Sequence, residues 1–76
     1  MTPLKALETA VRLLDGQSGL ARACGGNIKQ GHVWYWLKVG RIPAEHCIAV
    51  EKATKRKITR FDLRPDVFGR PRQRHE

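Results

Sequence analysis

The apolar residues near the start of the chain recur with the spacing of one helix face. Steps of three and four predict a stripe made of Leu4, Leu7, Val11 and Leu14. Pro3 suits the first helical position, with Thr2 as the cap before it, because the missing N–H of proline would be unpaired there in any case. Asp15 and Gly16 predict the end of this helix.

Two short helices follow, joined by a glycine-containing turn. They are predicted over residues 17–24 and 29–38. Their inner faces are expected to hold Leu20, Ala21 and Cys24 in the first, and Ile28, Val33, Trp36 and Leu37 in the second. Gly25 stands where the first helix must end in a left-handed residue, which glycine adopts without steric penalty. Two helices joined in this way are the helix-turn-helix pattern.

The rest of the apolar pattern is shorter. A fourth helix is predicted from Ile42-Pro43 to about Lys55. Its inner face is expected to consist of Ala44, Cys47, Ile48 and Glu51, with Val50 flanking the core. Thr59 then caps a single turn, with Asp62 accepting from the N–H of the capping residue, and Pro65 stops that turn. The residues expected to fold back on the bundle are Ile58, Leu63, Val67 and Phe68.

These elements predict an all-α fold. We expect a compact bundle of four to five helices with a short C-terminal turn over residues 1–69, followed by a flexible basic tail over residues 70–76. The residues expected to be buried together are Leu7, Val11, Leu20, Ala21, Val33, Trp36 and Ile48. A chain of 76 residues has a small core and no room for a catalytic cleft of ordinary size. The protein is therefore not expected to be an enzyme, and His46 with Glu45 or Glu51 would form an acid/base pair on a helix surface.

The charge is strongly positive and uneven. The net charge is +8, and residues 1–28 contribute only +1 of it, from three cations against Glu8 and Asp15. Such an excess in a small domain indicates a polyanionic partner, nucleic acid or an anionic membrane surface, although surplus Lys and Arg can also serve solubility alone. No segment approaches the roughly 20 apolar residues of a membrane span, and the first ten residues do not resemble a signal peptide. We therefore expect a cytoplasmic protein.

The cysteines and histidines do not predict a metal site. Cys24 and Cys47 lie far apart among apolar helical positions, which is typical of buried thiols in a reducing compartment. They show no paired ligand spacing with His32 or His46, so neither a metal nor another cofactor is expected.

The outward face of the helix over residues 29–38 carries the candidate chemistry. Lys29 and Gln30 are suited to guanine and adenine edges in the major groove, and His32 could also reach a base. Tyr35 and Lys38 are better suited to phosphates, as are the backbone N–H groups at Gln17 and Ser18. The full set of expected DNA-binding residues is Gln17, Ser18, Lys29, Gln30, His32, Trp34, Tyr35, Lys38 and Arg41.

Less specific readings of the same residues stay open. Lys29 and Gln30 could be a solvated helix start, and His32 an ordinary surface histidine. Trp34 either contacts the sugar-phosphate backbone or wedges between helices. Adjacent helical residues lie about 100° apart, so the three aromatic residues 34–36 cannot all face inward, and at least one is exposed. An exposed aromatic side chain of this kind favours a binding surface.

The chain also resembles a known family. The segments QSGLARACG, KQGHVWYWL, RIPAEHCIAVEKAT and ITRFDLRPDVFG are similar to Cro-like helix-turn-helix regulators of the YdaS-type antitoxin family. The resemblance covers residues 4–69 and implies a lambda-repressor-like DNA-binding domain, often prophage-encoded. The segment over residues 25–28 is about two residues longer than the family's usual turn, with Ile28 in the apolar turn position.

This resemblance and the residues together predict a repressor. We expect sequence-specific binding of double-stranded DNA, as a homodimer, at an operator near the protein's own gene. The resemblance also implies a toxin-like protein partner. The alternative is an antitoxin that acts mainly by binding a cognate toxin, and a third reading is sequence-independent binding of DNA or RNA through the basic tail.

Overall fold

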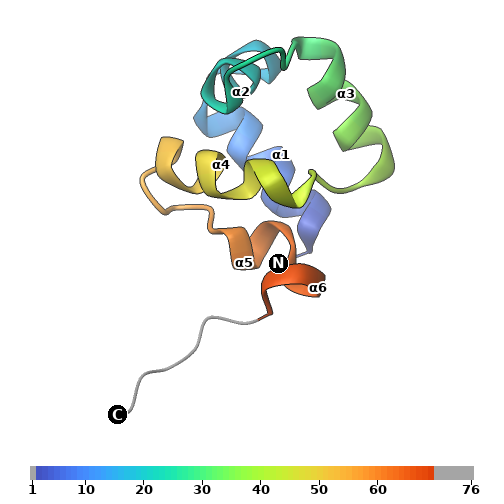
Figure 1. Cartoon of the computed structure of the whole chain (residues 1–76), viewed down its shortest axis with the longest axis vertical. Coiled ribbons are helices and arrows are strands. Elements are labelled where there is room, and N and C mark those ends of the chain that lie inside the picture. The colour runs from blue at the N-terminus through green and yellow to red at the C-terminus, as the bar shows by residue number, and fades with distance from the viewer. Residues whose placement is uncertain (1, 70–76) are drawn as a thin grey trace.

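The chain folds as a helical bundle, shown in Figure 1. The computed structural model describes residues 2–69, and the predicted tail over residues 70–76 lies outside them. Within residues 2–69 there are six α-helices, one 3₁₀ turn and no strand. The elements are α1 (Pro3–Leu13), α2 (Gln17–Cys24), α3 (Gln30–Val39), the 3₁₀ turn η1 (Ala44–His46), α4 (Cys47–Ala53), α5 (Arg60–Leu63) and α6 (Pro65–Phe68). The all-α prediction is confirmed, but the structure has more than the four to five helices predicted, because Pro65 not only follows the end of α5 but also begins α6.

The predicted helix boundaries agree closely with the structure in the first half. Thr2 caps α1 through its side chain, which accepts from the N–H of Lys5 at 3.1 Å, and Pro3 is the first helical residue. The helix α2 has the predicted bounds, and Gly25 at its end has a φ of 75°. The helix α3 begins and ends one residue later than predicted. The α5 cap is also confirmed: Thr59 accepts from the N–H of Asp62, and the Asp62 carboxylate accepts from the N–H of Thr59.

The α1 face differs from the predicted stripe. Leu7 is buried, but the residues buried beside it are Ala6 and Ala10, while Leu4 is exposed and Val11 only half-buried. The small side chains of Ala6 and Ala10 let neighbouring helices approach α1, which packs against α2, α3 and α5. The larger residues of the predicted stripe lie at the edges of this contact.

The fourth predicted helix needs a larger correction. It starts as the 3₁₀ turn η1, and α4 ends at Ala53 rather than near Lys55. Val50 is fully buried, whereas Ile48, predicted for the core, is 42% exposed. Ile48 and Val50 lie about 200° apart on a helix, so only one can face inward. Packing of α4 against α2 and α5 selects Val50.

One core joins these elements. Its buried apolar residues are Ala6, Leu7, Ala10, Leu20, Ala21, Val33, Trp36, Ile42, Cys47, Val50, Ile58 and Leu63. Phe68 packs against this core, as predicted, but Val67 is exposed. The core therefore draws on every helix except α6, whose Phe68 covers it from one side.

The start of α2 is fixed by a close backbone approach. Gly19 is buried, and a Cβ placed there would collide with the carbonyl oxygen of Leu14. Only glycine allows α2 to turn this sharply from the end of α1. The position of α2 relative to α1 thus depends on a residue to which the sequence pattern gave no role.

Candidate nucleic-acid interface

The helix α3 lies at one edge of the bundle, and most of one side is free of the other helices (Figure 1). Val33 and Trp36 are buried and hold α3 against the core. The exposed predicted site residues on and beside it are Lys29, Gln30, His32, Trp34, Tyr35, Lys38 and Arg41. The structure thus brings seven of the nine predicted residues to one helix and its two ends.

Gln30, Trp34 and Lys38 form one line along this surface, because they are four residues apart. The Lys38 ammonium lies 5.2 Å from the centroid of the Trp34 ring. At this distance the cation is attracted to the face of the indole. Trp34 and Tyr35 are 55% and 57% exposed, while Trp36 is 5% exposed, so two of the three aromatic residues face outward.

His32 has a role at the start of α3. Its Nδ1 accepts a hydrogen bond of 3.0 Å from the N–H of Lys29, the residue that caps the helix. Its ring lies 6.4 Å from that of Trp36, centroid to centroid. Only Nε2 of His32 is therefore left to contact a ligand, so His32 could read a base through this one ring nitrogen and not through both.

The start of α2 offers backbone donors. Its cap residue, Gly16, has no side chain to accept a hydrogen bond, and no other side chain caps this helix. The first N–H groups of a helix have no partner within it. Gln17 is half-buried and Ser18 exposed, so these donors lie at the surface, at the positive end of the helix dipole.

The turn between α2 and α3 comprises residues 25–29. The N–H of Ile28 donates to the carbonyl of Gly25 at 3.2 Å, and the Ile28 side chain packs against the core. Ile28 thus takes the apolar position expected of it in the turn.

The C-terminal end of α3 is supported by a residue that sequence reasoning missed. Arg64 donates from one terminal nitrogen to the carbonyl of Ile42 at 3.0 Å. Its other side-chain nitrogens donate to the Asp66 carboxylate at 3.0 and 2.8 Å. The hydrogen bond from Arg64 lowers the pKa of Asp66 to about 2. This network ties α6 to the segment that follows α3.

Arg41 lies next to the same network. Its guanidinium is 3.8 Å from the Asp66 carboxylate, and its side chain is 61% exposed. The predicted DNA-binding arginine is therefore oriented by a carboxylate yet accessible to a second anion. The ion pair between Arg64 and Asp66 could have been predicted, because these residues are two positions apart in the sequence. The contact of Asp66 with Arg41 could not, because Arg41 lies far away along the chain.

The charged side chains that α3 and its flanking residues contribute to this surface are all cationic, and the Asp66 carboxylate approaches the surface only at Arg41. Residues 29–41 contain three cations and no acidic residue. The Glu45–His46 pair, 3.4 Å apart, lies outside this segment, with Glu45 78% exposed. Within residues 2–69 no three His, Cys, Asp or Glu side chains are grouped to hold a metal, and no helix is long and apolar enough to cross a membrane.

The cysteine thiols are not part of the surface. Cys47 is buried, and its thiol donates to the carbonyl of Pro43 at 3.6 Å. Cys24 is half-buried rather than buried as predicted. Burial raises the pKa of both thiols to about 11, which keeps them protonated at neutral pH.

Two helices joined by a glycine turn, the second held by its inner face and exposed along a cationic outer face, define a helix-turn-helix protein. Over residues 7–72 the sequence matches the family described as "Bacterial toxin YdaS", and the chain belongs to this family. The predicted relationship to YdaS-type proteins is confirmed, although the family's description names a toxin and not an antitoxin.

Two individual proteins are similar to the chain. The "Putative transcriptional regulator YdaS" of Escherichia coli (strain K12) is 36% identical over 63 residues, which are 82% of this chain and 62% of that protein. The chain thus spans less than two thirds of that relative's length. A solved structure described as "Structure of the Cro protein from putative prophage element Xfaso 1 in Xylella fastidiosa strain Ann-1" is 39% identical, with a TM-score of 0.78 over 84% of this chain and 95% of that one. The Cro-like fold is thereby confirmed.

Proposed function

We propose that this protein binds double-stranded DNA sequence-specifically and acts as a Cro-like repressor, with α3 as the recognition helix in the major groove. The observation that carries this proposal is the exposed face of α3, which presents Gln30, Trp34 and Lys38 in line on a helix without acidic residues. A helix of this width fits the major groove, where amide and ammonium groups can pair with base edges.

The DNA contact proposed for each residue follows from its position on α2 or α3. Gln30 is at the start of α3 and would read adenine N6 and N7, and Lys29 beside it would contact guanine. The uncapped start of α2 would bind a phosphate through its N–H groups. Tyr35, Lys38 and Arg41 would contact the sugar-phosphate backbone and fix the register of α3.

The relatives support this proposal by their descriptions, a transcriptional regulator and a prophage Cro protein. We further propose that the operator lies near the protein's own gene and is bound by a homodimer. A toxin or antitoxin role through a protein partner is the second candidate, favoured by the family description.

The first test is footprinting on the DNA that flanks the protein's own gene. A protected palindromic site supports the proposal, and binding without any preferred site contradicts it. The second step compares Gln30→Ala with Lys38→Ala on the protected site and on scrambled DNA. Gln30→Ala should cost about 1–3 kcal/mol on the specific site alone, while Lys38→Ala should weaken both nearly equally. Equal losses on both DNAs for Gln30→Ala would show that Gln30 does not read bases.

A further inference from the structure

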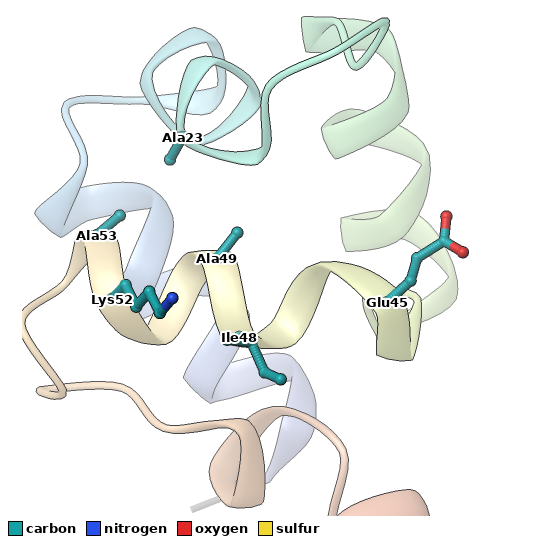
Figure 2. A pocket seen from close by; sticks show the side chains of 6 residues that line it. All are labelled: Ala23, Glu45, Ile48, Ala49, Lys52 and Ala53. Carbon is teal, nitrogen blue, oxygen red and sulfur yellow. The ribbon is translucent and has the colours of Figure 1, made fainter.

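A shallow groove runs between α2 and α4, shown in Figure 2. It has a volume of about 570 Å³ and is lined by Ala23, Glu45, Ile48, Ala49, Lys52 and Ala53. Ala23 points from α2 toward α4, and Ala49 and Ala53 point back toward α2. None of these six residues belongs to the proposed DNA surface. The groove is thus a separate feature of the molecule.

The side of the groove formed by η1 and α4 has an exposed apolar centre between opposite charges, with Glu45 in η1 and both Ile48 and Lys52 in α4. Ile48 is 42% exposed, although isoleucine is usually buried. Glu45 and Lys52 lie at the two ends, both exposed, seven residues apart. Lys52 forms no ion pair with any residue of the described range 2–69. Among the same described residues, Glu45 forms an ion pair only with His46, at 3.4 Å.

We propose that this groove binds the same groove of a second copy of the chain, with the two α4 helices antiparallel. In a two-fold interface, residue i of one chain meets residue j of the other, and j meets i. Residues 45 and 52 are equally far from the midpoint between Ile48 and Ala49. An axis at that midpoint therefore places Glu45 opposite Lys52 of the second copy at both ends.

The same axis also gives complementary packing of apolar side chains at the centre of the interface. Ile48 of each copy comes opposite Ala49 of the other, so that a large side chain meets a small one, beside the hollow at Ala23 and Ala53. A parallel arrangement would instead place Glu45 against Glu45 and Lys52 against Lys52, which is repulsive. Charge and shape thus favour one orientation and one occupant.

The expected dimer is weak in isolation. Stable interfaces bury about 1,600 Å² in total, more than one short helix face and a single residue of α2 provide. Exposed ion pairs are also screened by salt. This inference rests on the homodimer of the proposed function, but the interface is measured without DNA. A groove that does not mediate dimerisation would therefore leave the DNA-binding proposal intact, and a protein that does not bind DNA would leave the interface intact.

The test is sedimentation equilibrium of the full chain over a concentration series at low salt. The mass of the wild type should rise with concentration, from that of one chain toward that of two chains at the highest concentrations. Glu45→Lys and Lys52→Glu should each weaken association about tenfold or more, because each replaces two attractive contacts by two repulsive ones. An equimolar mixture of the two variants should restore association, since a mixed pair has opposite charges at both ends again.

Two further variants separate this interface from general charge effects. Glu8→Lys, on the exposed side of α1, changes net charge as Glu45→Lys does and should leave association unchanged. Ile48→Arg should abolish association while leaving the helical circular dichroism unchanged, because Ile48 is outside the core. A monomeric wild type, association of Lys52→Glu at wild-type strength, or a mixture no stronger than the single variants would each overturn the proposal.

Discussion

Gly31 occupies the second position of α3, although nothing in the fold requires glycine there. Its φ is not positive, and a Cβ added to it would have no atom within 4 Å. Glycine in a helix is less favourable than alanine by about 0.5–1 kcal/mol. Gly31 lies beside Gln30 on the exposed start of α3, where a missing side chain lets the helix backbone approach a ligand closely.

Gly31→Ala is therefore expected to separate stability from binding. The free energy of unfolding should rise by about 0.5–1 kcal/mol, while affinity for operator DNA should fall about tenfold or more. Chemical denaturation and a DNA titration measure the two effects. The control is Thr9→Ala on α1, which, like Gly31→Ala, changes no charge and introduces a residue that favours helix formation. It should leave DNA affinity unchanged. A Gly31→Ala protein that binds like the wild type would contradict a close approach at this position.

Thr54 shows a different kind of residue-level effect, a buried hydroxyl that organises a loop. It is 5% exposed, its Oγ1 accepts from the N–H of Ile58 at 3.2 Å, and it lies within 3.2 Å of the carbonyls of Val50, Glu51 and Ile58. One proton can serve one of these carbonyls at a time. Thr54 thereby joins the end of α4 to Ile58, across the basic residues 55–57.

Thr54→Val should lower the free energy of unfolding by about 1–3 kcal/mol, because the buried N–H of Ile58 would lose its partner. For a chain of this size each kcal/mol shifts Tm by about 4–8 °C. Thr9→Val is the matched control, since the Thr9 hydroxyl bonds only within α1, to the carbonyl of Lys5. Equal melting temperatures for the two valine variants would show that the Thr54 contacts contribute nothing.

The exposure and contacts of some residues could be predicted from the sequence, and those of others could not. Helix geometry alone predicted that at least one of the aromatic residues 34–36 is exposed, and the structure exposes two of them. The burial of Val33 and Trp36 followed from their spacing. Thr54 and Arg64 were not foreseen, because their partners come from loops whose paths depend on the finished fold. Gly19 was missed for the same reason, since its need for glycine comes from the Leu14 carbonyl.

At the scale of elements, helix ends were predicted better than helix faces. The caps at Thr2 and Thr59 depend on residues within one turn, which the sequence displays directly. The buried face of α4 depends on α2 and α5, which lie far along the chain. The choice between Ile48 and Val50 was therefore beyond a local pattern, and it was wrong for Ile48.

The loop after α4 was also beyond local rules. Lys55 and Arg56 have φ values of 55° and 66°, a region that side chains other than glycine, asparagine and aspartate rarely adopt. The N–H of Arg56 donates to the carbonyl of Glu51 at 2.8 Å, which closes the end of α4. Glu51 in turn accepts from the N–H of Arg60 at 2.9 Å through its side chain and supports the start of α5.

The link between α6 and the end of α3 should be sensitive to acid. The pKa of Asp66 is lowered from 3.8 to about 2 in the folded protein, chiefly by the hydrogen bond from Arg64. A lowered carboxyl pKa stabilises the fold above the unfolded value and loses that effect as the pH falls toward the folded value. This contribution should therefore be present above pH 3.8 and be lost between pH 3.8 and about 2.

Asp66→Asn should flatten the loss of stability over that pH range. Denaturation at a series of pH values measures it, with Glu8→Gln on the exposed side of α1 as the control. The wild type and the control should lose stability more steeply than Asp66→Asn. Parallel curves for all three proteins would show that the Arg64–Asp66 contact does not contribute to acid sensitivity.

For the whole molecule, the helical order and the helix-turn-helix arrangement could be predicted because each helix carries its own periodic signal. The positions of the nine predicted site residues followed from that arrangement, seven of them on or beside α3. Their contacts with DNA remain a prediction. The relation between separate basic segments could not be predicted, since it depends on how the bundle closes. The basic loop over residues 55–57 and α3 lie on opposite sides of the bundle in Figure 1.

Because of this separation, removing two cations from one side or the other should change the salt dependence of DNA affinity by different amounts. Log affinity for DNA falls with log salt by about 0.9 per phosphate neutralised. The double variant Lys38→Ala/Arg41→Ala removes the two cations proposed to contact phosphates, and it should therefore make the slope shallower by about two units. The matched variant Lys55→Asn/Lys57→Ala removes the same charge from the far side, and asparagine tolerates the left-handed conformation at position 55. Its slope should stay close to that of the wild type. If both variants flatten the slope equally, the DNA contact surface extends around the molecule from α3 to the loop after α4, and α3 alone does not define it.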